Sequence, residues 1–586
     1  MNLSGAPVYR VEIADLKAHL LRVHLTIPAP LDQQEVSLPV WIPGSYMVRE
    51  FSGHLQKLQA RQGRKRLKPE QLDKCSWRLP CRAGQALELS YEVYANDASV
   101  RMAQLNHERC FFNPTSVCLR AHGQDETSLI LEVPPPVEHP RWTLATGLEP
   151  LKVDRRGFGR YRATDYDELA DCPVCFGELW SGQFQAGGVT HRFVVSGAPP
   201  TFDGQRLLED TRKICEAQIR FWHGKGKPPM SQYVFMLHAV GDGYGGLEHR
   251  NSTALICGRK DLPGTDTSKV TEGYATLRGL ISHEYFHTWN VKRLRPAPFA
   301  RYDYSRENYT DLLWFFEGFT SYYDDLMLRR CALLDNAGYL KLLGKTINQV
   351  LQTPGRQVQS VAQASFDAWV KYYRHNENTP NATVSYYSKG ALVALCLDLT
   401  LRTLRPDLHL DRILRELWQR CRGGPMSQDD LLEQLQASSG RSFEAEIKHW
   451  VHSTEELPLE PLLRAHGVAV LKEPDQLAQR LGLRVDDSQG LKVKTVLHGG
   501  AAHAAGLSPG DEWLAIEQAS GRGWRLRRLD DLLLYAPATG KVHALVSRDE
   551  QLLRLPLKIP APGHTWRLAV KDASLLDRWL GPTPAD

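Results

Sequence analysis

The chain has 586 residues, of which 42% are hydrophobic and 24% charged, and its formal net charge is +5. This length exceeds what one hydrophobic core supports, so several globular domains are expected. The charges are interspersed and their excess is small, which argues against nucleic acid as a partner. No apolar run reaches the roughly 18 residues of a membrane span, and no signal-peptide pattern is visible, so we predict no membrane partner and a cytoplasmic location.

Eleven cysteines, an odd number, are scattered from Cys75 to Cys421. This distribution favours reduced thiols over a disulfide framework. One Cys-x-x-Cys motif joins Cys172 and Cys175. Because neither a second pair nor a helix N-terminus accompanies it, we interpret both thiols as structural.

Residues 1–180 are predicted to form an N-terminal β-sandwich or saddle-shaped β domain. Their strand-like segments alternate apolar and polar residues between turns: VYRVEIA, HLLRVHLTI, EVSLPVWI, LELSYEVYA and LILEVP. The stretch WIPGSYMVREF at 41–51 is interpreted as a structural turn or as part of a cleft wall.

Residues 181–330 mix strand and helix patterns and are predicted to form a second domain. Gly241, Gly243 and Gly246 match G-x-G-x-x-G, but a nucleotide site requires a helix at the third glycine, and the strand-like LEHRNSTALI follows instead. We therefore expect a glycine-rich bend leading into an edge strand, with Glu248 projecting into a cleft. Glu248 then either binds the α-ammonium of a peptide or is a surface glutamate.

The stretch SHEYFHTWN at 282–290 contains the pattern H-E-x-x-H. In a helix, His283 and His287 lie one turn apart on one face and direct two imidazoles at one point, which suits a zinc ion. Glu284 is rotated about 100° from His283 and can reach a water at the metal as a general base. The basic residues that follow, Lys292, Arg293 and Arg295, are interpreted as a solvated or salt-bridged loop.

Glu317 is the predicted third zinc ligand. It lies thirty residues after His287 in the aromatic run LLWFFEGFTSYYDDL, where a carboxylate is costly unless it is paired or bound to metal. Asp324 follows two helical turns later on the same face. It can accept a hydrogen bond from the free ring N–H of a zinc-bound histidine.

Residues 331–465 are predicted to form a helical domain packed on the zinc domain. Before one of its helices stands VSYYSKGA. Either Tyr386 or Tyr387 could donate a hydrogen bond to a developing oxyanion, and both could instead be core aromatics.

Residues 466–562 form a separate segment. The stretch GGAAHAAGLSPGDEWLAI resembles a PDZ domain, a module that binds extended peptide ends by strand addition. By this resemblance LGLRV at 481–485 is the carboxylate-binding loop. The C-terminal tail, 563–586, is expected to be poorly ordered.

Four stretches together resemble the glycyl aminopeptidase family of zinc metallopeptidases, which is of the gluzincin type: HEYFHTWNVKRLRP, ENYTDLLWFFEGFTSYYDD, GGLEHRNST and YSKGA. The resemblance implies a multidomain α+β fold with a β-rich N-terminal domain, a thermolysin-like catalytic domain, a helical domain and a C-terminal PDZ domain. It also implies a zinc-dependent aminopeptidase that favours small N-terminal residues such as Gly or Ala. The alternatives are a zinc endopeptidase whose PDZ domain recruits substrate and a non-catalytic peptide-binding scaffold.

The resemblance also assigns roles, matched position by position. The zinc ligands are His283, His287 and Glu317, the general base is Glu284, the oxyanion donor is Tyr387 rather than Tyr386, the substrate-binding residues are Glu248, Gly245 and Gly246, and the acid behind the ligands is Asp324. The implied partners are peptide substrates and a peptide C-terminus at the PDZ domain.

Overall fold

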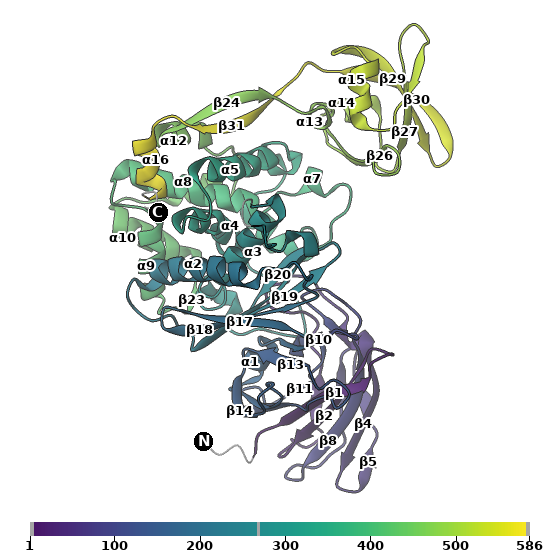
Figure 1. The fold of residues 1–586 in the computed structure, drawn as a ribbon, viewed down its shortest axis with the longest axis vertical. Helices are drawn as coiled ribbons and strands as arrows, with labels where there is room; N and C mark the ends of the chain where they lie inside the picture. The colour runs from purple at the N-terminus through teal and green to yellow at the C-terminus, as the bar shows by residue number, and fades with distance from the viewer. Residues whose placement is uncertain (1–4, 267–269, 582–586) are drawn as a thin grey trace. The chain divides into compact units, whose positions relative to one another are not determined.

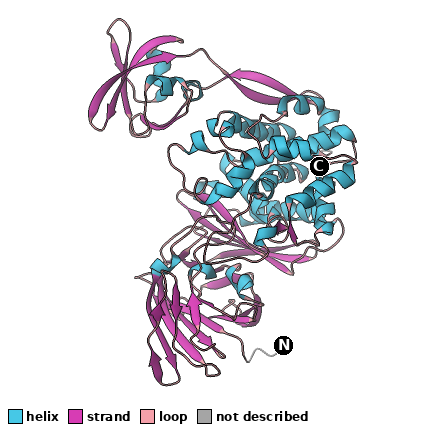
Figure 2. Cartoon of the chain, turned by 180° about the vertical axis from the view of Figure 1, so that it is seen from behind, coloured by secondary structure: helices cyan, strands magenta, loops and turns pink. Residues whose placement is uncertain are grey.

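The computed structural model describes residues 5–266 and 270–581. The chain divides into two compact units. The first unit comprises Met1–Tyr309 and Arg415–Ser427, and the second comprises Thr310–Leu414 and Gln428–Asp586. Figure 2 distinguishes the strands from the helices along the chain.

The first unit begins with β-sheets, of which the largest has the strand order β14-β15-β12-β1-β2-β8-β4-β5. Every second residue of its central strand β2 is buried, the period-two pattern of a sheet with one buried face. β1 and β12 pair in parallel. The strands are β1 (Val8–Asp15), β2 (Leu20–Ile27), β4 (Leu55–Gln62), β5 (Lys65–Leu67), β8 (Leu87–Tyr94), β12 (Leu129–Val133), β14 (Glu149–Val153) and β15 (Gly159–Ala163).

The smaller sheets of this region have the orders β13-β16-β10-β9 and β11-β3-β7-β6. Their strands are β3 (Glu35–Ser37), β6 (Glu70–Gln71), β7 (Ser76–Arg78), β9 (Ala103–Leu105), β10 (Arg109–Phe112), β11 (Arg120–Ala121), β13 (Thr143–Thr146) and β16 (Val174–Gly177). One apolar core joins these sheets to the large sheet.

The eleven cysteines, all within the described part of the chain, are free thiols. Cys172 and Cys175 are buried, and the thiol of Cys172 lies 3.7 Å from the Asn251 side-chain oxygen. Burial raises the pKa of both thiols, which keeps them protonated and unreactive.

A further sheet of the first unit has the order β17-β18-β19-β21-β20. β18, β19 and β21 are parallel neighbours, and β20 pairs with β21 in antiparallel fashion at the end of the order. The strands are β17 (Trp180–Ala186), β18 (Val189–Ser196), β19 (Gln232–Val240), β20 (Tyr244–Glu248) and β21 (Ser252–Gly258). Gly246 lies inside β20 rather than at the start of a helix, which confirms that the glycine pattern is not a nucleotide site.

The strand predicted across LEHRNSTALI is wrong in one respect. β20 ends at Glu248, and the chain turns before β21 begins at Ser252. Asp171 binds the backbone N–H of Arg250 in this turn at 3.1 Å. Glu248 is therefore the last residue of an outer hairpin strand, and it directly precedes the turn.

Helix α3 (Glu272–Phe286) carries the H-E-x-x-H motif and packs beside α2 (Gly204–His223) in the first unit. The side chain of Thr271 caps its N-terminus by accepting the backbone N–H of Tyr274 at 3.1 Å. Gln218 of α2 donates to the backbone oxygen of Ser282 at 2.8 Å, directly before the motif. The helix is therefore fixed at both ends.

The second unit contains the helices α4 (Leu313–Arg330), α5 (Asn336–Leu351), α8 (Ser388–Leu404), α10 (Gln428–Ser439), α11 (Glu444–Trp450) and α12 (Leu459–Ala465). α4 and α8 approach closely where Gly318 meets Gly390. A Cβ atom on Gly318 would lie 2.5 Å from the Cα of Gly390, so only glycines permit this crossing. It brings the start of α8 beside the residue before Gly318, which is Glu317.

A two-stranded ribbon, β24 (Val468–Pro474) with β31 (His564–Val570), connects the helices of the second unit to a small β domain (Figure 1). The small domain has its own core and the strand order β25-β26-β27-β29-β30. Its elements are α13 (Leu477–Leu481), β25 (Leu483–Asp486), β26 (Lys492–Val496), α14 (Ala501–Ala505), β27 (Glu512–Glu517), β28 (Gly523–Arg525), α15 (Leu532–Tyr535), β29 (Gly540–Arg548) and β30 (Gln551–Ile559).

The expectation of a poorly ordered tail is wrong for most of its residues. After β31 the chain forms α16 (Ala573–Leu580), which packs on α4. The indole N–H of Trp579, a buried side chain, donates to the hydroxyl of Tyr322 at 3.1 Å. Residues 582–586 of the predicted tail lie outside the described residues. Among the helices that are described, none has the length and apolarity to cross a membrane.

Candidate metal centre and active site

His283 and His287 lie at the end of α3. The helix ends at Phe286, but His287 retains helical dihedral angles as its C-cap, so the two histidines stay one turn apart. Their Nε2 atoms lie 3.1 Å from each other. The Nδ1 of His287 lies 2.8 Å from the backbone oxygen of Asn290, so it carries the ring proton and leaves the Nε2 lone pair for a metal.

Glu317 joins these two histidines in one group. One ligand atom from each of His283, His287 and Glu317 can be chosen so that all lie within 4.8 Å of one another. Two imidazoles and one carboxylate are a donor set that zinc binds in hydrolases, with a fourth position open to water or substrate. Glu317 is only 2% exposed and lies in α4 among buried phenylalanines, where a carboxylate requires a compensating cation. The group therefore fits a zinc ion.

Glu284 is buried, and its carboxylate packs directly against β20. A Cβ atom on Gly246 would lie 2.1 Å from the Oε1 atom of Glu284. The preceding residue, Gly245, has a φ of 156°, which a side chain would also oppose. The two glycines leave bare backbone beside the predicted general base.

Glu248 is 4% exposed, and its Oε1 has no hydrogen-bond partner among the described residues. The turn of WIPGSY lies directly against it, because a Cβ atom on Gly44 would meet the Glu248 carboxylate at 2.6 Å. Gly44 has a φ of 90°, which favours glycine at this turn. The surface-glutamate alternative for Glu248 is thus wrong, and a turn of the N-terminal β region packs directly on its carboxylate.

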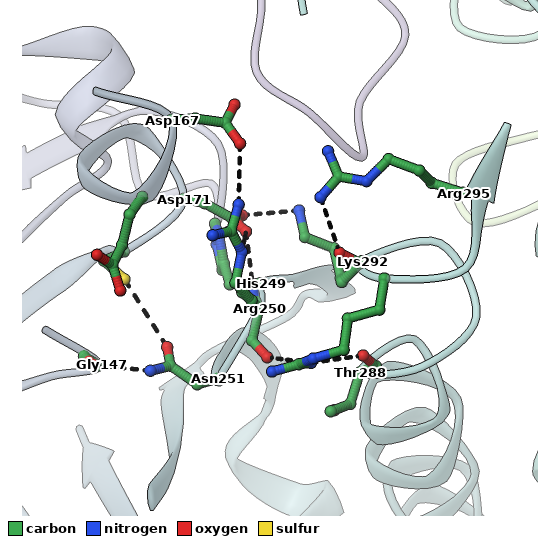
Figure 3. Close-up of polar contacts among 12 residues, drawn as sticks. Gly147, Asp167, Asp171, His249, Arg250, Asn251, Thr288, Lys292 and Arg295 are labelled. Carbon is green, nitrogen blue, oxygen red and sulfur yellow. Dashed lines mark hydrogen bonds and ion pairs between the residues drawn. The ribbon is translucent and has the colours of Figure 1, made fainter. Parts of the chain in front are cut away.

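A buried ion-pair cluster holds the hairpin turn and the loop after α3 together (Figure 3). Asp171 lies 2.7 Å from the ammonium of Lys292 and 3.1 Å from Nδ1 of His249, and it also binds the backbone of Arg250. Burial opposes the charge of Lys292, but Asp171 outweighs this effect and raises the pKa of Lys292 above its ordinary value. Of the two interpretations of the basic loop, solvated or salt-bridged, the second is therefore confirmed for Lys292.

The loop that Lys292 anchors is strained. Val291 has a φ of 107°, which is rare for a β-branched residue. Its N–H donates to the Leu294 oxygen at 2.8 Å, and the N–H of Lys292 donates to the His287 oxygen at 3.1 Å. Arg293 donates to the backbone oxygens of Thr288 and Arg250 at 2.7 and 2.8 Å. These contacts fix the backbone that orients the imidazole of His287.

Tyr387 directly precedes α8, and its ring stacks on Tyr386 and Tyr372 with centroids 4.8 and 5.4 Å apart. Tyr386 is fully buried, whereas Tyr387 is half-buried. Burial, and after it the negative charge of Glu317, raises the pKa of Tyr387 well above its ordinary value. The Tyr387 hydroxyl therefore stays protonated and lies close enough to Glu317 to sense its charge.

Asp324 lies half-buried on α4, and its Oδ1 accepts the N–H of Asp325 at 2.6 Å. Its predicted contact with a zinc-bound histidine stays a prediction. The backbone oxygen of Asn290 and the Asp171–Lys292 pair were not predicted. The first has no side-chain signal, and the second joins residues more than a hundred positions apart.

Three family models match the chain: M61 glycyl aminopeptidase at residues 276–393, the peptidase M61 N-terminal domain at 8–178 and the PDZ domain at 470–543. A crystal structure of an aminopeptidase N family protein from Idiomarina loihiensis is 38% identical, with a TM-score of 0.92 over 98% of this chain and 100% of that chain. An M1 zinc metallopeptidase from Deinococcus radiodurans is 15% identical, with a TM-score of 0.48 over 78% of this chain and 95% of that chain. No curated protein matches. The predicted multidomain α+β fold with a C-terminal PDZ domain is confirmed.

Proposed function

Because the chain belongs to the M61 glycyl aminopeptidase family of zinc metallopeptidases, we propose that it releases the N-terminal residue of peptides and favours glycine or alanine there. His283, His287 and Glu317 would hold the zinc ion. When bound, zinc supplies Lewis acidity and lowers the pKa of a bound water to roughly 7. Glu284 accepts the proton of the attacking water and delivers it to the leaving amine.

Tyr387 donates a hydrogen bond to the oxygen that gains negative charge as the peptide bond is attacked. A tyrosine hydroxyl keeps its proton at neutral pH and can donate it in a hydrogen bond, and the charge of Glu317 acts on this hydroxyl. Gly245 and Gly246 offer backbone to the substrate beside Glu284. Asp324 is proposed to orient a zinc ligand.

The observation that carries the exopeptidase assignment is the buried carboxylate of Glu248. A buried acceptor without a hydrogen-bond partner is costly, and a substrate α-ammonium would supply that partner to Oε1 of Glu248. Binding the α-ammonium at a fixed point selects the first peptide bond for attack. The close approach of Gly44 to the same carboxylate supports a narrow pocket and hence small first residues.

The test is a panel of alanine and glycine peptides, each with a free and an N-acetylated terminus, with zinc content measured for every protein. We expect turnover of the free peptides only, and its loss with a chelator. Glu284→Gln should keep zinc and lose about 10²- to 10⁴-fold in kcat, whereas Glu272→Gln, at the exposed start of the same helix, should keep full activity.

Glu248→Gln should raise KM for free peptides without loss of zinc. Equal cleavage of acetylated peptides would instead make the protein an endopeptidase. If the zinc-loaded protein hydrolyses none of these peptides, the non-catalytic peptide-binding scaffold is the alternative that remains.

We further propose that the PDZ domain binds a peptide C-terminus. β25 stands at the end of its sheet order, and Gly482 before it adopts a left-handed conformation with a φ of 72°. A cavity of about 1350 Å³ is lined by Leu483, Arg484 and Val485 of this strand together with residues of α5 and of the ribbon of β24 and β31. A labelled peptide with a free C-terminus should bind at least tenfold more tightly than its C-terminal amide, and equal affinity would contradict strand addition at the carboxylate-binding loop.

A further inference from the structure

The PDZ domain is hydrogen-bonded to the segment that leads into Tyr387. Asn381 lies in the short helix α7 (Thr379–Ala382), six residues before Tyr387, and is 5% exposed. Its side-chain NH₂ donates to the backbone oxygen of Val496 at 2.9 Å, and its side-chain oxygen accepts the N–H of His498 at 2.9 Å. Both polar ends of one buried amide are thus bound to the PDZ backbone.

The PDZ side of this contact is a firmly held piece of backbone. Val496 ends β26 and pairs with Leu483 of β25. The N–H of Leu497 donates to the oxygen of Gly482 at 2.8 Å. Asn381 therefore binds backbone that is already fixed against the neighbouring strand.

The other side of the contact leads directly to the tyrosine. Thr383, two residues after Asn381, donates its hydroxyl to Gln359, and its backbone packs so tightly on Gly355 that a Cβ there would lie 2.2 Å from the Thr383 oxygen. Tyr387 then leads into α8, and its backbone oxygen accepts the backbone N–H of Ala391 at 2.9 Å. Between these fixed points the chain has little freedom, so a shift at α7 would move the Tyr387 ring.

We propose that Asn381 is a positioning residue, through which the PDZ domain holds the Tyr387 hydroxyl in place for oxyanion stabilisation. The inference rests on the proposed role of Tyr387. It assigns the PDZ domain a part in turnover that is separate from peptide binding. Misplacement of a catalytic group by about 1 Å can cost up to 10²-fold in rate, so a lost anchor should lower kcat rather than raise KM.

The chain supplies a matched control. Asn348 of α5 makes the same pair of bonds to the backbone of the PDZ-bearing ribbon, because its NH₂ donates to the Trp566 oxygen and its oxygen accepts the Trp566 N–H, both at 2.8 Å. Asn348 does not lie in the segment that leads to Tyr387. Asn348→Ala therefore removes an equal attachment between the helices and the ribbon without releasing the tyrosine.

The experiment is a double-mutant cycle on the zinc-loaded, full-length protein with alanine p-nitroanilide as substrate. Asn381→Ala should lower kcat on the order of tenfold with KM changed less than about twofold, and Asn348→Ala should leave kcat unchanged. Tyr387→Phe should lower kcat by about 10²- to 10³-fold. In that background Asn381→Ala should have little further effect, because residues that act through one another are not additive.

Equal kcat for the two asparagine variants, or losses that multiply in the double mutant, would overturn the inference. If Tyr387→Phe keeps wild-type kcat, the role of Tyr387 itself fails. If Tyr387→Phe is impaired while Asn381→Ala is not, only the positioning role fails. Should Asn381→Ala not fold, the isosteric Asn381→Asp, which loses the bond to Val496, replaces it in the same cycle.

Discussion

Gly246 sets how closely β20 approaches the Glu284 carboxylate. Its φ is not in the left-handed region, so the reason for glycine here is space alone. We expect Gly246→Ala to displace Glu284 and to lower kcat by about 10²-fold, because the proposed general base would no longer reach the attacking water. Steady-state kinetics with zinc analysis would measure this effect.

Gly241→Ala is the control for this prediction. No atom lies within 4 Å of the position of its added Cβ, and it belongs to the same glycine-rich stretch. Its activity should match the wild type. A Gly246→Ala variant with normal kcat would mean that Glu284 can shift without loss and that the close packing has no role in catalysis.

At the residue scale, side-chain chemistry carried the prediction of the metal group. His283, His287 and Glu317 are recognisable because two imidazoles one helical turn apart and a carboxylate among aromatics each need a partner. The support behind them was not predictable. Every residue has a backbone oxygen, so the sequence does not single out that of Asn290. Only the strained loop at Val291 places this oxygen against His287.

Asp171 connects elements that are distant in sequence. It follows α1 (Tyr166–Ala170) and binds both the turn after β20 and the loop after α3. Removing one partner of a buried ion pair leaves the other charge uncompensated, so we expect Asp171→Asn to lower the free energy of unfolding by about 3–5 kcal/mol at neutral pH. Urea unfolding at several pH values measures this loss.

The pH dependence of this loss has a defined sign. Burial alone would raise the pKa of Asp171, but Lys292, His249 and Arg250 hold it well below its ordinary value. A lowered carboxyl pKa stabilises the fold above the unfolded-state value of about 3.9, and the benefit disappears as pH falls toward the folded-state value. The difference between wild type and Asp171→Asn should therefore shrink below about pH 4.

Asp167→Asn is the matched control, because Asp167 pairs with Arg250 in the same cluster but its side chain is 35% exposed. Asp167→Asn should lower the free energy of unfolding by no more than about 1 kcal/mol. A loss from Asp171→Asn that stays constant down to pH 2, or that equals the loss from Asp167→Asn, would contradict the buried-pair assignment.

At the scale of elements, long periodic segments were predictable and short turns were not. The apolar spacing in α3 indicates a helix from sequence alone. The break between β20 and β21 has no glycine or proline, and Arg250 turns there because Asp171 binds its N–H. A tertiary contact of this kind leaves no local signal.

At the scale of the whole molecule, the order of domains was predicted from strand and helix patterns and from the family resemblance, but the last helix was not. Asp572 caps α16, and Leu576, Trp579 and Leu580 form its buried face. A helix of this length is unstable alone and forms only against α4. The sequence of this segment alone therefore does not predict a helix, because the helix depends on the surface of α4 against which Trp579 packs.

The ribbon of β24 and β31 has a consequence for how this chain can change. Pro474 and His564 are its last paired residues, and the backbone oxygen of Gly563 accepts the N–H of Asp475 at 3.3 Å. The two ends of the small domain therefore lie side by side where they join the ribbon. A cassette with adjoining ends can be exchanged, duplicated or deleted by recombination, and a tight hairpin would reseal the gap. Without the cassette, Asn381 would lose the backbone groups of Val496 and His498 that it binds. Relatives that lack the cassette would therefore need another contact to hold the corresponding tyrosine in place.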